Sequence, residues 1–367
     1  MRAIQICALI LAPIPAFSQN APSATSPEVL PDRRVTFRIN APKASDVTLT
    51  VDWLGQPQKM SKGDDGAWTA TLGPLAPATY IYSFTVDGMA IPDPINPRIK
   101  LRARGAGSLF DVPGDAPAMW QSRDVPHGSV EINWQRSKAL NGETRAIWVY
   151  TPPGYQNEPT RRYPVVYLLH GSNDTAAGWT TAGSVNFILD NLIAAKEAVP
   201  MIVVMPFGHA QPFGAPRTPG QQSNTELFEQ YLLTDVMPTI ERKYRIAAKR
   251  DQRALAGLSM GGEQSLAIGF SHTDLFGSIG ALSPSMPRDL STRWAAVIKD
   301  SKGTNAAMKT IWIACGRQDP GHLDASRRIA ETLKEHQIRH TYRETEGAHN
   351  FALWQQHMIE LVPLLFR

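Results

Sequence analysis

The chain has 367 residues, of which 43% are hydrophobic and 19% are charged, and its formal net charge is +4. This length exceeds the usual size of one domain, and the composition excludes a largely disordered chain and a multi-pass membrane protein. The positive charges form no long Lys/Arg run. Because nucleic-acid binding by a basic protein requires a clustered patch, we predict no nucleic-acid partner.

The first residues have the pattern of a cleavable export signal. Met1 and Arg2 supply a short positive region, the stretch up to Phe17 is almost wholly apolar, and Ser18 completes a small-x-small cleavage pattern. The apolar run is too short to span a membrane, and two prolines interrupt it. We therefore predict a signal peptide over residues 1–18, no membrane span, and a secreted or periplasmic protein.

A flexible leader and a single cysteine are expected in the mature chain. Residues 19–27 are rich in Ser, Pro and Ala, a composition typical of flexible segments. Cleavage of the signal peptide removes Cys7 and leaves only Cys315, so no internal disulfide can form. A lone cysteine beside a glycine is more often a small buried residue than a nucleophile, and we predict that role for Cys315.

Short alternating segments fill residues 28–112. Turn residues rich in Gly, Pro, Asp and Asn separate them. This spacing predicts a small antiparallel, immunoglobulin-like β-sandwich. Trp53 and Trp68 are either buried packing residues, the commoner case, or exposed rings that stack on sugars. The alternating segments are residues 35–39, 47–51, 67–72 and 80–86.

After a connector at residues 113–124, apolar strands alternate with amphipathic helices over residues 125–367. This alternation predicts a mostly parallel sheet covered on both faces, with a ligand site beyond the carboxyl ends of its strands. The predicted strands are residues 146–150, 165–169, 201–205, 254–256, 279–282, 311–314 and 340–342. The predicted helices are at about 184–196, 225–243, 260–270, 323–336 and 350–365.

The strongest chemical pattern lies where one of these strands ends. The segment Gly257-Leu258-Ser259-Met260-Gly261 follows the strand 254–256 and opens the helix 260–270. It is a G-x-S-x-G nucleophile elbow in the strand–turn–helix setting of the α/β-hydrolase fold. The tight turn requires minimal side chains around the serine, and the helix N-terminus favours a developing oxyanion. We predict Ser259 as the nucleophile; the alternative is a Gly-rich turn with an ordinary N-cap serine.

A serine nucleophile needs a base, and in this fold the acid and then the histidine follow the serine along the chain. His349 lies on the loop between the strand 340–342 and the last helix, where an imidazole could reach Ser259. We therefore predict His349 as the base. The other candidates lie within predicted helices or begin a strand: His336, His340 and His357.

Two aspartates compete for the role of the acid. Asp319 follows the strand 311–314 in a loop, as an orienting carboxylate should. Asp324 falls in the first turn of a helix, where the helix dipole explains an acidic residue. We predict Asp319.

The oxyanion hole requires a second backbone donor besides the Met260 amide. His170-Gly171-Ser172 comes directly after the strand 165–169, in the position of a donor loop. Gly171 lets the chain turn close to a substrate, and the Ser172 amide is the preferred donor, with the Gly171 amide as the alternative. We predict that His170 is a packed loop histidine.

Four segments of the α/β domain occur in a familiar order: YPVVYLLHG (163–171), GLSMGG (257–262), CGRQD (315–319) and EGAHNFALW (346–354). Together they resemble the esterase-D-type enzymes and, more closely, the feruloyl and acetylxylan esterases of carbohydrate esterase family 1. The resemblance maps Ser259, Asp319 and His349 onto the family's triad. Asn350 stands where many relatives carry Asp, which leaves the base in place but alters its surroundings.

The sandwich has a resemblance of its own. FRINAP (37–42), GAW (66–68), YIY (80–82), VDG (86–88) and DPINP (93–97) resemble a family-48-type, E-set carbohydrate-binding module. The two resemblances together imply an exported serine esterase that removes acyl groups from plant cell-wall polysaccharide or oligosaccharide. We expect the sandwich to lie near the mouth of the esterase site and to contribute to substrate binding more than to chemistry.

Other functions stay open. Siderophore esterases of the enterochelin type and mycolyl acyltransferases share the catalytic fold, and an inactive hydrolase scaffold would leave a carbohydrate-binding protein. A small ester is a further possible substrate. The sequence has no metal-ligand cluster and no nucleotide loop, so we predict no metal and no cofactor.

The choice between the two aspartates is open to a direct test. We expect Asp319→Asn to lower turnover of an activated ester by about 10³- to 10⁴-fold, because the amide cannot orient and stabilise the histidine as a carboxylate does. Asp324→Asn is the matched control and should stay within about twofold of wild type, as surface substitutions usually do. Steady-state kinetics on p-nitrophenyl acetate measure both, and a large loss only at Asp324 would reverse the assignment.

Overall fold

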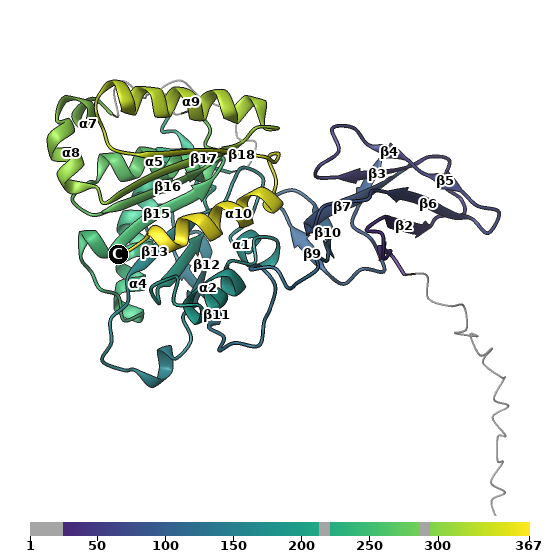
Figure 1. Cartoon of the computed structure of the whole chain (residues 1–367), viewed down its shortest axis with the longest axis horizontal. Helices are drawn as coiled ribbons and strands as arrows, with labels where there is room; N and C mark the ends of the chain where they lie inside the picture. Colours follow the sequence, from purple (N-terminus) through teal and green to yellow (C-terminus); the bar gives the residue numbers. More distant parts are fainter. Residues whose placement is uncertain (1–24, 213–220, 287–293) are drawn as a thin grey trace, which may run out of the picture.

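The computed structural model describes residues 25–212, 221–286 and 294–367. The predicted signal peptide and residues 19–24 of the leader lie outside the described residues. A β-sandwich is joined to a larger α/β domain (Figure 1). The predicted fold class is thereby confirmed.

Two antiparallel sheets form the sandwich, and alternate side chains of both sheets meet in one apolar core. One sheet has the order β1-β2-β6-β5, with β1 Glu28–Val29, β2 Val35–Asn40, β6 Ala67–Leu72 and β5 Ser61–Lys62. The other has the order β4-β3-β7-β10-β9, with β4 Gln58–Lys59, β3 Val47–Val51, β7 Ala78–Val86, β10 Ala106–Val112 and β9 Ile99–Leu101; β8 (Met89–Ile91) pairs with β7.

The two tryptophans of the sandwich are packing residues. Trp68 is buried, and its indole N–H donates to the Ala41 carbonyl at 3.0 Å. Trp53 is half-buried against the ring of Tyr80, with 4.5 Å between the ring centroids. Neither ring is a free platform for stacking on a sugar.

The α/β domain is built on an eight-stranded sheet in the order β11-β12-β14-β13-β15-β16-β17-β18. The first two strands run antiparallel to their neighbours, and β14 through β18 are parallel. The central strands are apolar along their whole length because both faces are covered. The strands are β11 Ser129–Arg136, β12 Thr144–Thr151, β13 Val165–Leu169, β14 Ile202–Pro206, β15 Arg253–Leu258, β16 Ser278–Leu282, β17 Thr310–Gly316 and β18 Thr341–Thr345.

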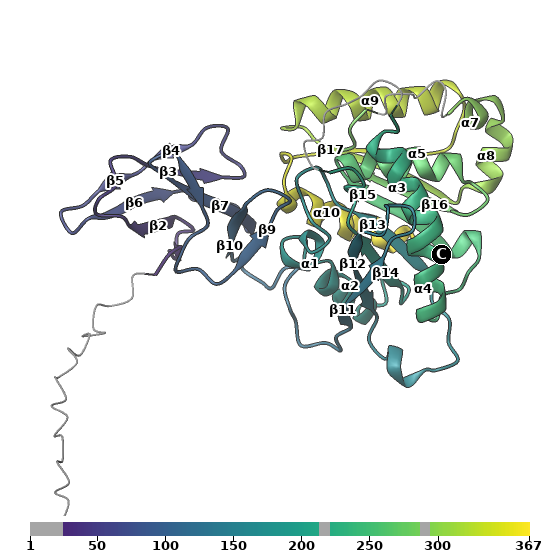
Figure 2. The ribbon, with the colours of Figure 1, turned by 180° about the vertical axis from the view of Figure 1, so that it is seen from behind.

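Helices cover both faces of this sheet, as Figures 1 and 2 show from opposite sides. Side chains of α2 (Val185–Ala194) and α10 (Phe351–Leu361) pack on one face. The other face carries α3 (Asn224–Tyr231), a π-helical turn (Leu232–Val236), α4 (Met237–Lys243), α5 (Met260–Ser271), α7 (Ala295–Lys299), α8 (Ser301–Ala307) and α9 (Pro320–Glu335). A short helix, α1 (Gly178–Thr181), follows β13.

The structure adds elements that the sequence patterns did not predict. β11 is an edge strand with exposed Val130, Ile132 and Trp134, so it lacks the continuous apolar run of a central strand. The hairpin of β9 and β10 completes the sandwich after β7. α9 begins three residues earlier than predicted, because Pro320 occupies its first turn.

The sandwich packs against the α/β domain through β7, β9 and β10. Ile81 and Leu109 of the sandwich belong to the same apolar cluster as Phe351 of α10. The Gln355 side-chain amide of α10 donates to the Thr79 hydroxyl at 3.3 Å. In both views β9 lies beside α1 and α10 (Figures 1 and 2). The contact therefore involves α1, which follows β13, and α10, which follows the loop carrying His349.

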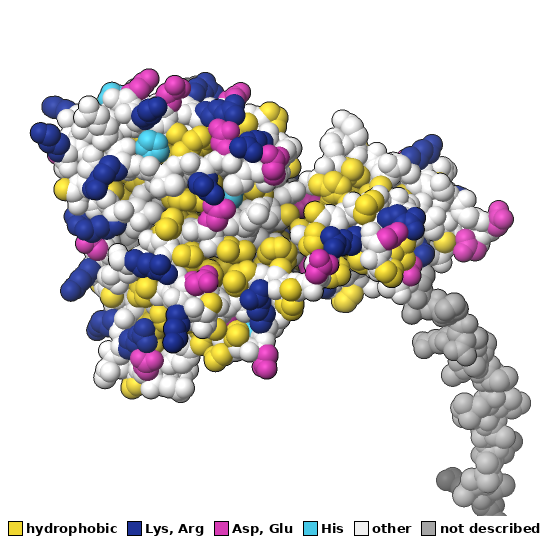
Figure 3. Space-filling model, in the orientation of Figure 1, with side chains coloured by type: hydrophobic (Ala, Val, Ile, Leu, Met, Phe, Trp, Pro, Cys, Tyr) yellow, Lys and Arg dark blue, Asp and Glu magenta, His cyan; other side chains and the backbone are white. Residues whose placement is uncertain are grey.

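The surface carries both signs of charge. On the face shown in Figure 3, Lys and Arg side chains are interspersed with Asp and Glu. Within residues 25–212, 221–286 and 294–367, none of the helices combines the length and apolarity needed to cross a membrane. The absence of a nucleic-acid partner stays a prediction.

Candidate active site

Ser259 occupies a turn between β15 and α5 at the carboxyl edge of the sheet. Its backbone has φ 53° and ψ −116°, a positive φ that is uncommon outside glycine. The Ser259 amide donates to the Leu282 carbonyl at 2.8 Å, and the Ser259 carbonyl accepts from the Ser285 amide at 3.2 Å. β16 and the residues after it therefore hold the turn in place.

The glycines around the serine are required by close backbone approach. A Cβ at Gly257 would lie 2.5 Å from backbone atoms of Gly261, and one at Gly261 would lie 2.5 Å from the Leu169 carbonyl oxygen. At Gly171 a Cβ would lie 2.6 Å from a methyl carbon of Leu258 and 3.2 Å from the Ser259 Cβ. The loop after β13 therefore packs directly on the serine.

Asp319 and His349 lie on neighbouring loops after β17 and β18, and their side chains meet. The His349 Nδ1 and the Asp319 Oδ2 are 2.6 Å apart. The Arg317 amide donates to the Thr345 carbonyl at 2.8 Å and ties the two loops together. Gly316 makes this approach possible, because a Cβ there would lie 2.1 Å from the Gly347 carbonyl oxygen.

A second histidine, His322 in the first turn of α9, completes this cluster. Its Nδ1 is 2.8 Å from the Asp319 Oδ1, and its ring stacks on His349 with centroids 3.9 Å apart and planes 17° apart. Burial raises the pKa of Asp319, but the hydrogen bonds from His322 and His349 outweigh it and hold that pKa well below its ordinary value. The carboxylate is therefore ionised at neutral pH and accepts from both rings.

His322 is not among the site residues predicted from the sequence. The sequence pattern that could have identified it is Asp-Pro-x-His, because this spacing places a histidine one helical turn after an aspartate that precedes the helix. Asp319 is the N-cap residue of α9, but its carboxylate makes no capping hydrogen bond. The two histidines take its oxygens instead.

The remaining neighbours of His349 fix its ring. The Trp354 ring meets it edge-on, with centroids 4.8 Å apart, and the Trp354 indole N–H donates to the Ser283 hydroxyl at 3.3 Å. Asn350 caps α10 by accepting from the Leu353 amide, so the amide side chain serves the helix start. Within the described residues, Ser259 and His349 share no hydrogen bond; such contacts often tighten only when substrate binds.

The two predicted oxyanion donors come from different elements: Ser172 lies on the loop after β13, and Met260 is the first residue of α5. Asp174 N donates to the Gly171 carbonyl at 3.3 Å and closes a turn that contains Ser172. Within the part of the chain that the structure describes, neither the Ser172 amide nor the Met260 amide donates to another backbone group. Both amides are available to a ligand oxygen.

His170 braces this loop from below the surface. It is fully buried, its Nε2 accepts from the Gly208 amide at 2.8 Å, and its Nδ1 is 2.8 Å from the Gly171 carbonyl oxygen. Because an amide N–H can only donate, Nε2 is unprotonated and Nδ1 carries the proton. Burial lowers the pKa of His170 and keeps the ring neutral.

The structure places the competing residues elsewhere. Asp324 is exposed on α9, and His336 is exposed at the end of that helix. His357 is buried and pairs with the Thr345 hydroxyl, and burial lowers its pKa to about 3. Cys315 is a buried free thiol whose pKa burial raises to about 11, which disfavours a nucleophilic thiolate.

One group of side chains has the composition of a metal site. Asp319, His322 and His349 place one ligand atom each within 4.8 Å of one another. The same atoms, however, are hydrogen-bonded to each other, with one imidazole on each carboxylate oxygen. A metal ion would have to displace both bonds, so the arrangement fits a hydrogen-bonded cluster better than a ligand set.

A nucleophile elbow after a central parallel strand, with an acid and a histidine on later loops of the same edge, defines the α/β-hydrolase fold. The family model described as a putative esterase matches residues 137–365. The chain belongs to this esterase family.

Relatives and solved structures agree with this family. An endo-1,4-beta-xylanase/feruloyl esterase from Xylanibacter ruminicola is 30% identical over 359 residues, which cover 95% of this chain and 47% of that protein. The chain thus spans about half the length of that relative. A ferulic acid esterase structure matches with a TM-score of 0.55 at 27% identity, over 65% of this chain and 97% of its own.

A further structure resembles both parts of the molecule. The enterochelin esterase from Shigella flexneri matches with a TM-score of 0.65 at 18% identity, over 92% of this chain and 93% of its own. At this identity the likeness concerns the fold. It extends over the sandwich as well as the α/β domain.

The contact of His322 with Asp319 predicts a measurable effect. His322→Phe keeps a ring against His349 but removes the donor to Asp319, and we expect turnover to fall by about 10-fold, the value of one hydrogen bond to a charged group. His336→Phe, at the exposed end of the same helix, is the control and should leave turnover unchanged. Kinetics on p-nitrophenyl acetate with parallel melting curves measure both, and equal turnover in the two variants would contradict the role of His322.

Proposed function

We propose that Ser259, His349 and Asp319 form the triad of a serine carboxylic-ester hydrolase. The observation that carries this proposal is the 2.6 Å contact between His349 and Asp319 on the edge of the sheet where the elbow holds Ser259. The ionised Asp319 accepts from Nδ1–H of His349, which leaves Nε2 unprotonated and able to accept a proton. This is the tautomer that a general base requires.

The reaction then proceeds in two halves. Ser259 Oγ attacks the ester carbonyl carbon while His349 Nε2 takes the hydroxyl proton. The tetrahedral intermediate expels the alcohol, which receives that proton, and the acyl group stays on Ser259. Water repeats the sequence with the same base, releases the carboxylic acid and restores the serine.

The charge that develops on the carbonyl oxygen needs donors. We assign this role to the backbone amides of Met260 and Ser172, which flank Ser259 from α5 and from the loop after β13. The N-terminus of α5 adds a favourable dipole. In comparable sites the loss of one such donor costs about 10²- to 10³-fold in rate.

We infer that the substrate is a feruloyl or acetyl ester on plant cell-wall polysaccharide or oligosaccharide. Support comes from the relative named as a xylanase/feruloyl esterase, which matches across nearly the whole chain, and from the ferulic acid esterase structure. Export by the N-terminal signal would bring the enzyme to such a substrate.

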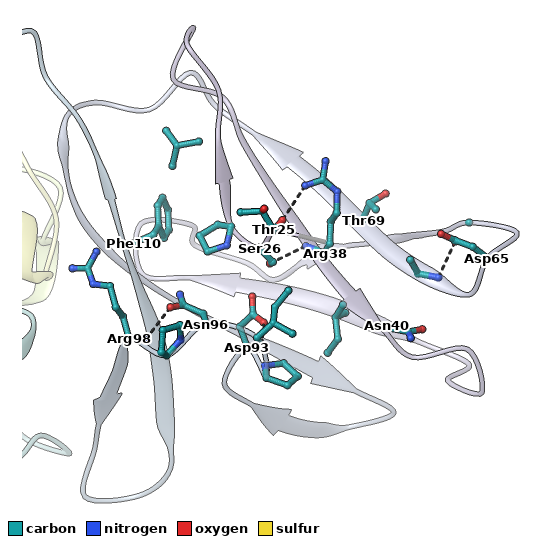
Figure 4. A pocket seen from close by; sticks show the side chains of 18 of the residues that line it. Thr25, Ser26, Arg38, Asn40, Asp65, Thr69, Asp93, Asn96, Arg98 and Phe110 are labelled. Carbon is teal, nitrogen blue, oxygen red and sulfur yellow. Dashed lines mark hydrogen bonds between the residues drawn. The ribbon is translucent and has the colours of Figure 1, made fainter. Parts of the chain in front are cut away.

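We propose further that the sandwich is an E-set, carbohydrate-binding module. A groove of about 1270 Å³ runs along it, lined entirely by residues of the sandwich and its leader (Figure 4). Charged and amide side chains line the groove, and those that reach solvent include Arg38, Asn40, Asp65 and Arg98. Because Trp53 and Trp68 pack inside, we expect sugar hydroxyls to be recognised by these polar groups.

Sugar binding by this groove is testable apart from catalysis. Arg98→Ala removes a cation that is half-exposed beside Asp111, and we expect affinity for arabinoxylan to fall about 3- to 10-fold, the value of one or two hydrogen bonds. Affinity electrophoresis on arabinoxylan gels measures it. Lys62→Ala, outside the groove lining, is the control. If the two variants are retarded equally on the gel, the groove does not contribute to substrate binding.

The catalytic proposal is tested by a hydrolysis panel with Ser259→Ala as the control. We expect turnover of methyl ferulate or acetylated xylan, and a loss of at least about 10³-fold on p-nitrophenyl acetate in Ser259→Ala. An acyl-enzyme trapped on Ser259 and seen by mass spectrometry would support the mechanism.

Each alternative gives a different outcome. Preferential cleavage of a ferric trilactone siderophore would assign the enterochelin-type activity, and transfer of the acyl group to a sugar hydroxyl would assign an acyltransferase. A folded protein without turnover on any ester would be a binding protein. Near wild-type turnover in Ser259→Ala would refute the mechanism itself.

A further inference from the structure

The hairpin of β9 and β10 in the sandwich reaches the loop that carries Ser172. The Lys100 ammonium and the Asp174 Oδ1 are 2.6 Å apart, and their side chains are only 3% and 8% exposed. This ion pair joins β9 to the residue that closes the turn around Ser172. At such burial the pair is little screened by solvent, and either charge alone would be costly.

The tip of the hairpin adds two backbone contacts to the same loop. The Ala103 amide donates to the Asn173 carbonyl at 3.2 Å, and the Arg104 amide donates to the Asn173 Oδ1 at 3.1 Å. On the other side, the Asn173 amide donates to His209 Nε2 at 3.2 Å. Asn173 has φ 60°, so these three bonds hold a left-handed residue directly after Ser172.

Asp174 connects these contacts to the nucleophilic serine through the turn that contains Gly171. Its Oδ1 also accepts from the Thr175 amide at 2.7 Å, and its own amide donates to the Gly171 carbonyl. Gly171 in turn packs on Leu258 and Ser259. The path from Lys100 to the nucleophile therefore consists of one ion pair, one four-residue turn and the close approach of Gly171 to Leu258 and Ser259.

Lys100 also lies against the histidine side of the site. Its ammonium is 5.2 Å from the centroid of the Phe351 ring, at the start of α10 and two residues after His349. Burial lowers the pKa of Lys100, and Asp174 opposes that shift. One side chain of the sandwich thus contacts the loop after β13 and the first residue of the helix that follows the His349 loop.

We propose that Lys100 is a positioning residue for the oxyanion hole: through Asp174 it holds the turn that aims the Ser172 amide at the reacting carbonyl. This inference rests on the proposed function of Ser259 and Ser172. It gives the sandwich a part in turnover, in addition to the binding role expected from the sequence. Lys100 does not touch the substrate.

The proposal predicts a kinetic signature on a substrate too small to contact the sandwich. Lys100→Met should lower kcat on p-nitrophenyl acetate by about 10-fold or more, because a misplaced donor loses much of what a deleted donor loses. KM should change by less than about twofold, since the oxyanion contact forms only in the transition state. Rates are expressed per active site, counted by phosphonate titration, so that misfolded protein does not enter.

A transition-state mimic separates positioning from general loosening. A phenylboronic acid forms a tetrahedral adduct on a catalytic serine and places an oxygen in the oxyanion hole. We expect its inhibition constant to rise in Lys100→Met by the same factor as kcat/KM falls. A purely structural role would lower the melting temperature and the number of active sites without changing either constant.

Two further variants keep the test decisive if Lys100→Met folds poorly. The double variant Lys100→Met/Asp174→Asn leaves no unpaired charge at the interface and should fold, yet still show the kcat loss because the link to the loop is gone. Lys62→Met makes the same substitution at a lysine whose ammonium bonds only within the sandwich, to the Pro42 and Ala44 carbonyls. It should keep wild-type kinetics.

The outcomes distinguish this inference from the function on which it rests. Unchanged kcat and boronate inhibition in the folded double variant would overturn the role of Lys100, while the triad proposal would stand. Retained turnover in Ser259→Ala would instead overturn the proposed function. A loss in the Lys100 and double variants but not in Lys62→Met supports the inference.

Discussion

The backbone conformation of Ser259 is the constraint on which the rest of the α/β domain depends. A non-glycine residue held away from its preferred φ and ψ costs on the order of 1–3 kcal/mol and persists only where its surroundings fix it. Here the Leu282 carbonyl of β16 accepts a hydrogen bond from the Ser259 amide. Gly257 and Gly261 allow the strand, the helix and the neighbouring loop to pack closely around the turn. The close packing around these glycines is what keeps the nucleophile at the edge of the sheet.

The other functional groups reach this serine from loops that are bonded to one another. The loops after β17 and β18 share backbone hydrogen bonds, and Asp319 joins His322 and His349 across them. The loop after β13 is held by His170 inside the domain and by the sandwich outside it. Substrate therefore meets groups whose geometry is set before it binds, as electrostatic stabilisation of a transition state requires.

Sequence patterns were sufficient where the signal is local. The apolar strands, the elbow around Ser259 and the loop position of His349 follow from runs of a few residues, and the fold class followed from them. β11 was missed because all three of its apolar side chains face solvent at an edge of the sheet. The start of α9 was predicted three residues too late because Pro320 was not taken as a helix start. Lys100 and Asp174 are 74 positions apart, and only the docking of two domains reveals their contact.

The buried pair of Lys100 and Asp174 also bears on how such proteins diversify. Accessory modules are often treated as independent domains that can be gained or exchanged without effect on the enzyme that follows them. A foreign sandwich lacking this lysine would leave a carboxylate unpaired in an apolar interface, at a penalty on the order of 3–5 kcal/mol. Recombination between relatives is thus constrained to carry the β9–β10 hairpin and the loop after β13 together, as one heritable unit.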